Sequence, residues 1–359
     1  MRRGFWCAKD VLSHGVIRFF KNPIYNNADF QMKNSNSRTF NSFTRLATLG
    51  VALAAVNTTH ADHGPGTSGG GASTQSGETM KPGKFAVEFR EDYTEFEHLS
   101  QAQIEAKAAK AGSIDLLDRS FIHSIGLSYG VVENFQVGLT LGYYQAVKAR
   151  EAEYDSGTGD TEILTSNPDG LTDLWLSGKY RFYRGPLGSF AVFGGVKFPT
   201  GRDDVKNSAG ESIEPSATAG SGAYDGMLGL AYSRFLTSRL TVDTSFQYTL
   251  RGEARDFRLG DRIDAGVAFA YRFTEDVKTF PQVSAFAEAN VRHLFESTDA
   301  GAHASNTGGT VLFLTPGFRV GFTPHLSFTV SSPLPVLQNL NGEQLKTSYK
   351  VNAALTVSF

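Results

Sequence analysis

The sequence contains no uninterrupted run of about 18 apolar residues, so no segment can cross a bilayer as a single helix. Its only cysteine is Cys7, and a mature chain without the N-terminus has no disulfide and no cysteine-based metal site. The formal net charge of -2 gives no sign of nucleic acid as a partner. Hydrophobic residues make up only 40% of the chain, although Gly and Phe are plentiful. These absences exclude a helical membrane protein and a disulfide-stabilised domain.

The N-terminal region has the features of an export signal. The most apolar stretch, 46–56, is too short to span a membrane; it follows two arginines and precedes Thr59-His60-Ala61. A positive flank, a short apolar centre and small residues at the end predict a secretory signal peptide, cleaved after Ala61. Residues 1–31 allow two interpretations. One is a twin-arginine signal at Arg2-Arg3, without an apolar region in reach; the other is a true translation start at Met32.

The remaining chain divides in two. Residues 62–81 are rich in Gly, Ser, Thr and Pro and cannot form a packed core, which predicts a flexible N-terminal segment. From residue 82 to 359, apolar and polar residues alternate with the period of a half-buried strand. Residues 262–273 are typical, since their odd-numbered positions are apolar or small and their even-numbered ones include Arg262, Asp264 and Arg272. We therefore predict 1–61 as extension plus signal, 62–81 as a flexible segment and 82–359 as one domain.

This domain has the strand number and loop pattern of an outer-membrane barrel. Most strands are longer than the usual 5 to 6 residues of soluble proteins and are long enough to cross a bilayer when tilted. Short and long connections alternate, as do periplasmic turns and extracellular loops in such barrels. We count about twelve strands, an even number, starting near residues 82, 118, 134, 170, 187, 222, 239, 261, 280, 309, 325 and 346.

The predicted fold is therefore an all-β, transmembrane, antiparallel up-and-down β-barrel of about 12 strands in the outer membrane of a Gram-negative bacterium. A short helix is expected over 100–112 in the first long loop, because Ser100 and Gln103 form a capping box and Gly112 suits the C-cap. This helix is either loop decoration or a lid over the mouth. Aromatic residues at the ends of the apolar faces suit the interfacial girdles of a lipid bilayer. Phe359, at the end of an alternating strand, resembles the terminal signal that the barrel-assembly machinery recognises.

Residues 170–201 carry a family resemblance. The segments Gly170-Leu171-Thr172-Asp173-Leu174, Lys179-Tyr180-Arg181-Phe182 and Gly195-Val196-Lys197-Phe198-Pro199-Thr200-Gly201 resemble the outer-membrane barrels named for the MetA pathway of phenol degradation. Thr172 departs from this pattern, which has a small glycine there. The strand layout agrees over 82–359. The resemblance implies a transporter related to barrels that carry hydrophobic compounds.

If the apolar faces meet lipid, the alternate positions line the lumen. A lysine or arginine facing lipid at mid-depth costs about 2 to 4 kcal/mol, so charged residues belong inside. These charges either pair across the lumen and rigidify the barrel, or they line a permeation path. Trp175 and Phe286 either stack an aromatic solute or serve packing. The predicted lumen residues are Arg90, Asp173, Trp175, Lys179, Arg181, Lys197, Asp225, Asp243, Arg262, Asp264, Arg272, Phe286, Glu288, Arg292, Arg319 and Lys350.

The sequence gives little evidence for a catalytic site or for a bound cofactor. His123 and Ser124 are neighbours and so face opposite sides of a strand, and the Gly-x-Ser-x-Gly elbow is missing. The sequence predicts no enzyme, no cofactor and no metal; a copper site at the new terminus Asp62-His63 would rest on one histidine. Two functions remain open. The first is a channel or transporter for small aromatic or hydrophobic molecules, and the second is a plugged structural or adhesive barrel that binds partners through its long loops.

Overall fold

The computed structural model describes residues 71–359, and the predictions made for the export signal, the translation start and Asp62-His63 lie outside the described residues. Strands predominate in this range, and the only helix within it is α2 (Gln101–Ala111), in the loop after the first strand. Among the same residues, no helix is long and apolar enough to cross a membrane.

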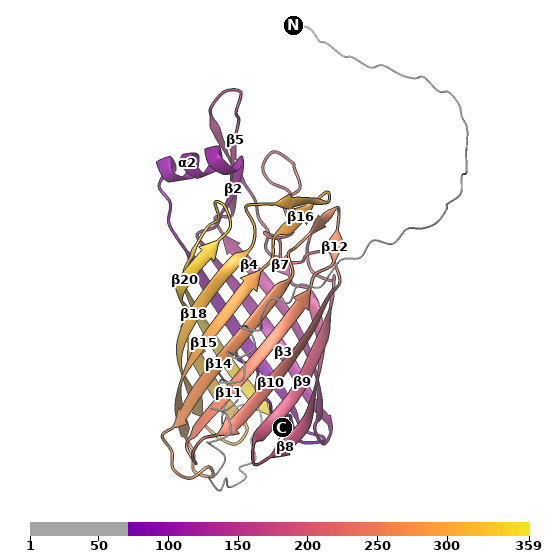
Figure 1. Cartoon of the computed structure of the whole chain (residues 1–359), viewed down its shortest axis with the longest axis vertical. Helices are drawn as coiled ribbons and strands as arrows, with labels where there is room; N and C mark the ends of the chain where they lie inside the picture. Colours follow the sequence, from indigo (N-terminus) through magenta and orange to yellow (C-terminus); the bar gives the residue numbers. More distant parts are fainter. Residues whose placement is uncertain (1–70) are drawn as a thin grey trace, which may run out of the picture. The chain divides into compact units, whose positions relative to one another are not determined.

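Twelve antiparallel barrel strands form a closed barrel (Figure 1). Each pairs with its neighbours in sequence, and β1 pairs with β21 from Ala86↔Ser358 to Phe96↔Thr347 to close the ring. The predicted all-β barrel and its strand number are thus confirmed. The barrel strands are β1 (Phe85–Phe96), β3 (Arg119–Val132), β4 (Phe135–Val147), β8 (Leu174–Gly185), β9 (Gly188–Phe198), β10 (Asp225–Phe235), β11 (Leu240–Leu250), β14 (Arg262–Arg272), β15 (Gln282–Leu294), β18 (Gly309–Gly321), β19 (Leu326–Ser331) with β20 (Leu334–Leu340) as one interrupted strand, and β21 (Thr347–Ser358).

Side chains on the barrel strands alternate between an apolar outer face and a mostly polar inner face. On β14, Phe269 is 47% exposed while its neighbours Ala268 and Ala270 are buried. An exposed apolar belt of this kind is stable only against lipid, which makes the chain a membrane-spanning barrel. Phe359 stacks on Phe85 with ring centroids 4.6 Å apart, so aromatic rings mark the end of the belt where the chain terminates.

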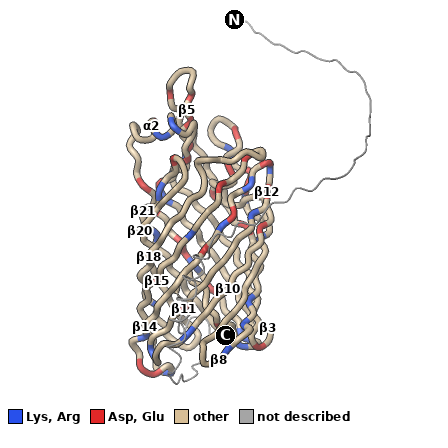
Figure 2. Tube along the Cα trace, in the orientation of Figure 1, with Lys and Arg blue, Asp and Glu red and all other residues tan. Residues whose placement is uncertain are grey.

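Short turns join the strands at one end of the barrel, and long structured loops join them at the other (Figure 1). By the rule for such barrels, the long-loop end is extracellular. Lys, Arg, Asp and Glu gather in the loops and turns at both ends (Figure 2). The loop strands are β2 (Ser113–Leu116), β5 (Arg150–Tyr154) and β6 (Thr161–Thr165) in one small sheet, β12 (Glu253–Ala254), β13 (Phe257–Arg258), β16 (Ser297–Asp299) and β17 (Ala302–Ala304) in another, and β7 (Gly170–Leu171), which pairs with β4.

Helix α2 begins and ends as its sequence predicts. Ser100 caps it, and both hydrogen bonds of the capping box with Gln103 are present. Gly112 ends it with a φ of 87°, which a residue with a Cβ rarely adopts. Ile104 and Ala108 pack on Ile114 of β2 and Ala152 of β5 in a small apolar core. The helix is therefore part of a compact extracellular cap formed by the first two long loops.

Candidate functional site: the lumen and its outer vestibule

Residues 71–81 lie inside the barrel, where inward-facing side chains of many strands hold them by hydrogen bonds. They contain neither helix nor strand. Gln75 N donates to Ser245 Oγ at 3.1 Å, Gly77 N to Ser233 Oγ at 2.7 Å, and Met80 N to Gln136 Oε1 at 2.8 Å. These partners come from the adjacent strands β11 and β10 and from β4, which is three strands away from β10 in the ring. We call residues 71–81 the lumen segment.

One carboxylate anchors the start of the lumen segment. Glu288 of β15 is buried and accepts hydrogen bonds from the backbone amides of Ala72, Ser73 and Thr74. The Thr74 hydroxyl also donates to it, at 2.9 Å, and Asn290 of the same strand donates to that hydroxyl at 3.1 Å. Bonds from neutral donors to a charged acceptor are the stronger kind. Glu288 is thus the principal anchor at this end.

Four basic residues contact the lumen segment along its length, the first being Arg319, which donates to Gly71 O at 3.4 Å. Arg90 Nη1 donates to Ala72 O at 2.9 Å, and Lys179 Nζ donates to Ser76 O at 3.0 Å. Arg181, which is almost fully buried, forms an ion pair of 2.5 Å with Glu78. The contacts that hold the segment are polar, and in an open lumen water molecules could take the place of most of these hydrogen-bond partners. The segment is therefore bound in the manner of a ligand.

Glycine is required where the lumen segment touches the wall most closely. A Cβ added at Gly77 would lie 2.4 Å from Ser189 O and 2.9 Å from Ser233 N. Both are backbone atoms of paired strands, so they cannot yield without breaking the ladder. The glycine-rich composition led us to predict a flexible segment. The same small residues let the chain lie close against the inner wall of the barrel.

A buried ionic cluster lies at the extracellular end of the lumen, beside β8, β9, β10 and β11. Lys197 is 4% exposed and pairs with Asp173 at 3.0 Å and Asp225 at 2.7 Å. Asp225 also pairs with Arg251 at 2.9 Å. Two acidic and two basic groups compensate each other, as buried charges must.

This cluster folds the loop after β9 inward. Asp173 accepts hydrogen bonds from the amides of Gly201, at 2.9 Å, and Ser221, at 3.0 Å. Gly201 and Gly220 approach so closely that a Cβ on either would meet the other's backbone. Asp173 and Gly201 belong to the segments that resemble the family. Asp173 thus holds together the two ends of the extracellular loop between β9 and β10. Thr172, the departure from the pattern, donates through its amide to Gly142 O and accepts the Gly142 amide on its hydroxyl, both at 2.9 Å.

Further charged and aromatic side chains line the remaining lumen. Arg262 and Arg292 both pair with Asp264, at 2.6 and 2.8 Å. Lys350 Nζ lies 5.6 Å from the ring centroid of Phe313, and the Arg319 guanidinium lies 5.7 Å from that of Phe286. Such cation–π contacts orient flexible basic chains over apolar surface.

By the alternation of side chains, the predicted lumen residues on barrel strands share the inner face, and Asp173 lies just before β8 in the ionic cluster. Cross-strand partners share a face, and Trp175 is directly opposite Lys197. Asp243 bonds to the same Ser233 hydroxyl that holds the lumen segment. Arg272 bonds to carbonyls of two short turns and so lies at the periplasmic rim. Their role in permeation is still a prediction.

The sequence did not predict the partners that complete these contacts. Glu78 and Ser221 lie in polar segments that the sequence predicts to be a linker and a loop. Gln136 and Asn290 are polar residues within strands, like many others. Only the closure of the ring brings them to the lumen segment and to the ionic cluster. The glycines at 201 and 220 are the one signal that could have indicated a close approach.

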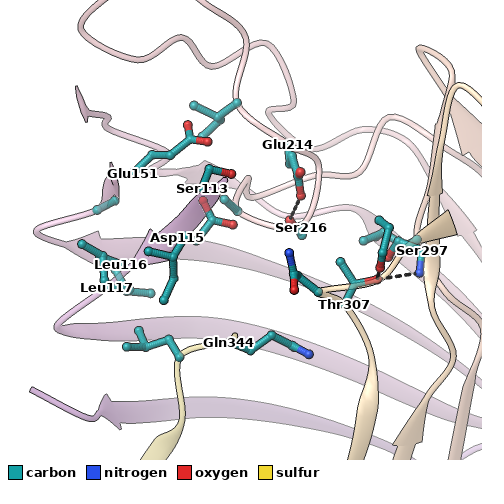
Figure 3. A pocket seen from close by; sticks show the side chains of 18 of the residues that line it. Ser113, Asp115, Leu116, Leu117, Glu151, Glu214, Ser216, Ser297, Thr307 and Gln344 are labelled. Atoms are coloured by element: carbon teal, nitrogen blue, oxygen red, sulfur yellow. Dashed lines mark hydrogen bonds between the residues drawn. The ribbon is translucent and has the colours of Figure 1, made fainter. Parts of the chain in front are cut away.

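A cavity of about 610 Å³ lies at the extracellular end, between the small cap sheet and the loops after β9, β11, β15 and β20 (Figure 3). We call it the vestibule. Its walls are partly apolar, with Ile114, Leu116, Leu164, Ile213 and Phe295 among them. Polar groups such as Ser216, Thr307 and Gln344 complete the lining (Figure 3). A cavity of this size and mixed lining can hold a small organic molecule.

Three carboxyl groups of the vestibule ionise less readily than usual. Asp115 is open to the cavity, but the loops around it withdraw it from bulk water. This desolvation, with repulsion from Glu214 and Glu151, raises the pKa of Asp115 to about 7. Desolvation also raises the pKa of Glu151 and of Glu214. Near neutral pH the vestibule is therefore less negative than its sequence indicates.

The described residues of the lumen and vestibule form no cluster of metal ligands. Across residues 71–359, no group of three or more His, Cys, Asp and Glu side chains is placed to hold an ion. The sequence predicted no metal, cofactor or catalysis, and those statements stay predictions.

The fold and lumen define a β-barrel of the outer-membrane type. The model of the family described by the MetA pathway of phenol degradation matches residues 149–334, and the chain belongs to that family. The resemblance noted in residues 170–201 is thereby confirmed. No curated protein matches the sequence.

Solved barrels are similar to this one in fold. The COG4313 outer membrane channel from Pseudomonas putida F1 superposes with a TM-score of 0.53 at 11% identity, covering 81% of this chain and all of that one. The transport unit of the autotransporter AIDA-I from Escherichia coli gives 0.43 at 12% identity, covering 89% of this chain and 97% of that one. The CymD monoaromatic hydrocarbon channel gives 0.38 at 12% identity, with coverage of 78% and 89%.

Proposed function

We propose that this protein is a channel of the Gram-negative outer membrane for small aromatic or hydrophobic molecules, and not an enzyme. The observation that supports the proposal best is the vestibule of about 610 Å³ above a lumen lined with charged and aromatic side chains. A solute would enter through the partly apolar vestibule and meet Trp175, Phe313 and Phe286 further in. The COG4313 outer membrane channel, which has a similar fold, agrees with this class.

The lumen segment makes the channel a closed or very narrow one. Its contacts with β4, β8, β10, β11 and β15 cross the periplasmic half of the lumen. A twelve-stranded barrel is already narrower than the open porins of 16 to 18 strands. We therefore expect selective passage of one solute class after the segment moves, and little free diffusion.

A second function is favoured by the same segment together with the ordered cap. A barrel permanently filled by residues 71–81 would be structural, and its cap of α2, β2, β5 and β6 would bind partners outside the cell. In either case the expected partners are the lipid bilayer and, through the strand that ends in Phe359, the barrel-assembly machinery.

Conductance in planar bilayers separates the two functions. The chain from Asp62 would be compared with a chain that begins at Lys81 and so lacks all but the last residue of the lumen segment but keeps β1. Discrete openings of the first, blocked in part by an aromatic acid or an uncharged aromatic solute, support the channel. If only the shortened chain conducts, and no solute alters the intact one, the structural function is supported and the channel is contradicted.

A further inference from the structure

Positive charges of the upper lumen are only partly compensated by carboxylates. The buried ionic cluster at the extracellular end contains two acidic and two basic groups, and Arg90 pairs with Asp92 at 2.9 Å. By contrast, Asp264 is the one carboxylate that pairs with both Arg262 and Arg292. One positive charge of these two arginines therefore remains without a negative partner.

Lys350 of β21 adds a second uncompensated charge. Within residues 71–359 its ammonium forms no ion pair and no hydrogen bond, and it lies 5.6 Å from the centroid of the Phe313 ring. Four charged groups act on this ammonium electrostatically, and only one of them, Asp92, is negative. Arg292 and Arg262 are among the positive ones, so the two excess charges lie in the same part of the lumen.

These three basic residues flank an apolar part of the inner wall. Arg292 is directly opposite Val311 in the β15–β18 ladder, and Arg262 lies on β14, the other neighbour of β15. From the opposite side, Lys350 reaches over Phe313, which is two residues from Val311 on β18. Val311 and Phe313 are both buried. Positive groups and apolar surface therefore meet at one place in the lumen.

Solvent reaches the two guanidinium groups although they face inward. The side chain of Arg292 is 39% exposed and that of Arg262 is 23% exposed. Each approaches Asp264 through its Nε atom, and in the described part of the chain their Nη atoms donate no hydrogen bond. A guanidinium with unused donors matches the geometry of a carboxylate and holds it by charge-assisted hydrogen bonds.

This group of residues lies between the vestibule and the lumen segment. Arg292 is four residues beyond the anchor Glu288 on β15, about 13 Å nearer to the extracellular end along the strand. Arg262 is opposite Leu294, which lines the vestibule. The vestibule opposes an anion less than its carboxyl groups suggest, because desolvation raises the pKa of Asp115 to about 7. A solute that enters from outside therefore meets the basic residues before it meets the segment.

We propose that Arg262, Arg292 and Lys350 bind the carboxylate of a small aromatic acid in the upper lumen. The ring of the acid packs on Val311 and Phe313. This proposal rests on the channel function proposed above and narrows its substrate class to aromatic carboxylates. Basic side chains around a pore select anions, and a solute must be held weakly enough to leave again. Asp264 provides that limit, because it competes with the solute for both arginines.

The test measures binding, so it does not depend on whether the lumen segment has moved. Fluorine NMR gives the affinity of the chain from Asp62 in detergent for para-fluorobenzoate and for the uncharged para-fluorobenzyl alcohol, with protein-free detergent as the blank. Lys350→Met is the main variant, because it removes a charge without leaving a carboxylate unpaired. Lys206→Met removes the same charge from an exposed loop and is the matched control. Heat-modifiability gels establish that each variant is folded.

We expect the acid to bind about tenfold more tightly than the alcohol, and Lys350→Met to weaken only the acid, by about fivefold. Asp264→Asn should tighten the acid, because it releases both arginines, which a purely structural role of the three charges does not predict. Equal affinities for the two probes, or an equal loss in Lys206→Met, overturn the site, and openings in the bilayer test above would then leave the channel standing. Selective binding by a chain that never conducts supports the site and removes the channel.

Discussion

Glu288 and Thr74 form the most fully bonded contact between the barrel wall and the lumen segment. The carboxylate accepts the Thr74 amide at 3.0 Å and the Thr74 hydroxyl at 2.9 Å, and it also accepts the two preceding amides. A carboxylate that binds consecutive amides imitates an anion in a backbone nest. The segment is therefore fixed at its upper end by charge, and further along by neutral bonds, by the Lys179 ammonium and by the Arg181–Glu78 ion pair.

Glu288→Gln should loosen the lumen segment. Replacing a charged acceptor by a neutral amide weakens bonds that contribute about 1.5 to 3 kcal/mol each. We expect the open fraction in single-channel recordings to rise about tenfold, which corresponds to about 1.4 kcal/mol. Glu88→Gln is the control, because Glu88 faces the same lumen but bonds to Thr356 of β21. An equal rise in both variants would mean that lumen charge, not the anchor, sets the open fraction.

Gly77→Val should expel the middle of the lumen segment. The new side chain would collide with backbone atoms of Ser189 and Ser233, and a paired wall cannot move aside. We expect conductance close to that of the chain that begins at Lys81. Gly226→Val is the control, because a Cβ at that position meets nothing within 4 Å. Wild-type conductance in Gly77→Val would show that the segment does not limit flow.

Lys197→Met should destabilise the extracellular end of the barrel. The substitution leaves Asp173 and Asp225 buried with less compensation, and removing one partner of a buried pair costs about 3 to 5 kcal/mol. We expect a lower unfolding temperature in heat-modifiability gels and faster proteolysis within residues 199–224. Lys206→Met, an exposed change in the same loop, should do neither. Unchanged melting of Lys197→Met would contradict a structural role for the cluster.

The vestibule should respond to pH through Asp115. Its pKa is raised to about 7, so ionisation is costlier in the folded cap than in an unfolded loop. The protonated form stabilises the cap fully below the ordinary aspartate pKa of about 3.9, and this stability is lost as pH rises toward 7. Hydrogen exchange of residues 113–117, corrected for intrinsic rates, should therefore accelerate between about pH 4 and 7 and level off above pH 7. Asp115→Asn should remove most of this pH dependence, and an unchanged profile would assign it to other groups.

Local rules predicted much of this protein. Alternation with period two, turns such as Gly185-Pro186-Leu187-Gly188 and the capping box at Ser100 each depend on neighbours in sequence, so the strands, their inner faces and α2 could be derived directly. Pro199 has no amide hydrogen to donate to a ladder, and β9 ends at the residue before it, Phe198. The charged residues had to face inward because lipid excludes them.

Contacts between distant residues could not be predicted in this way. Glu288 and Thr74 are separated by 214 positions, and no local pattern in a Gly/Ser-rich segment indicates that a lumen will bind it. The missing ladder between β20 and β21 likewise depends on which strands become neighbours when the ring closes, although Pro333 and Pro335 are plain in the sequence. The sequence by itself determined the barrel, its strand number and which side of each strand is polar. The tertiary structure alone decided what fills the lumen and which ladder of the wall is interrupted, because ring closure brings together residues that are far apart in the sequence.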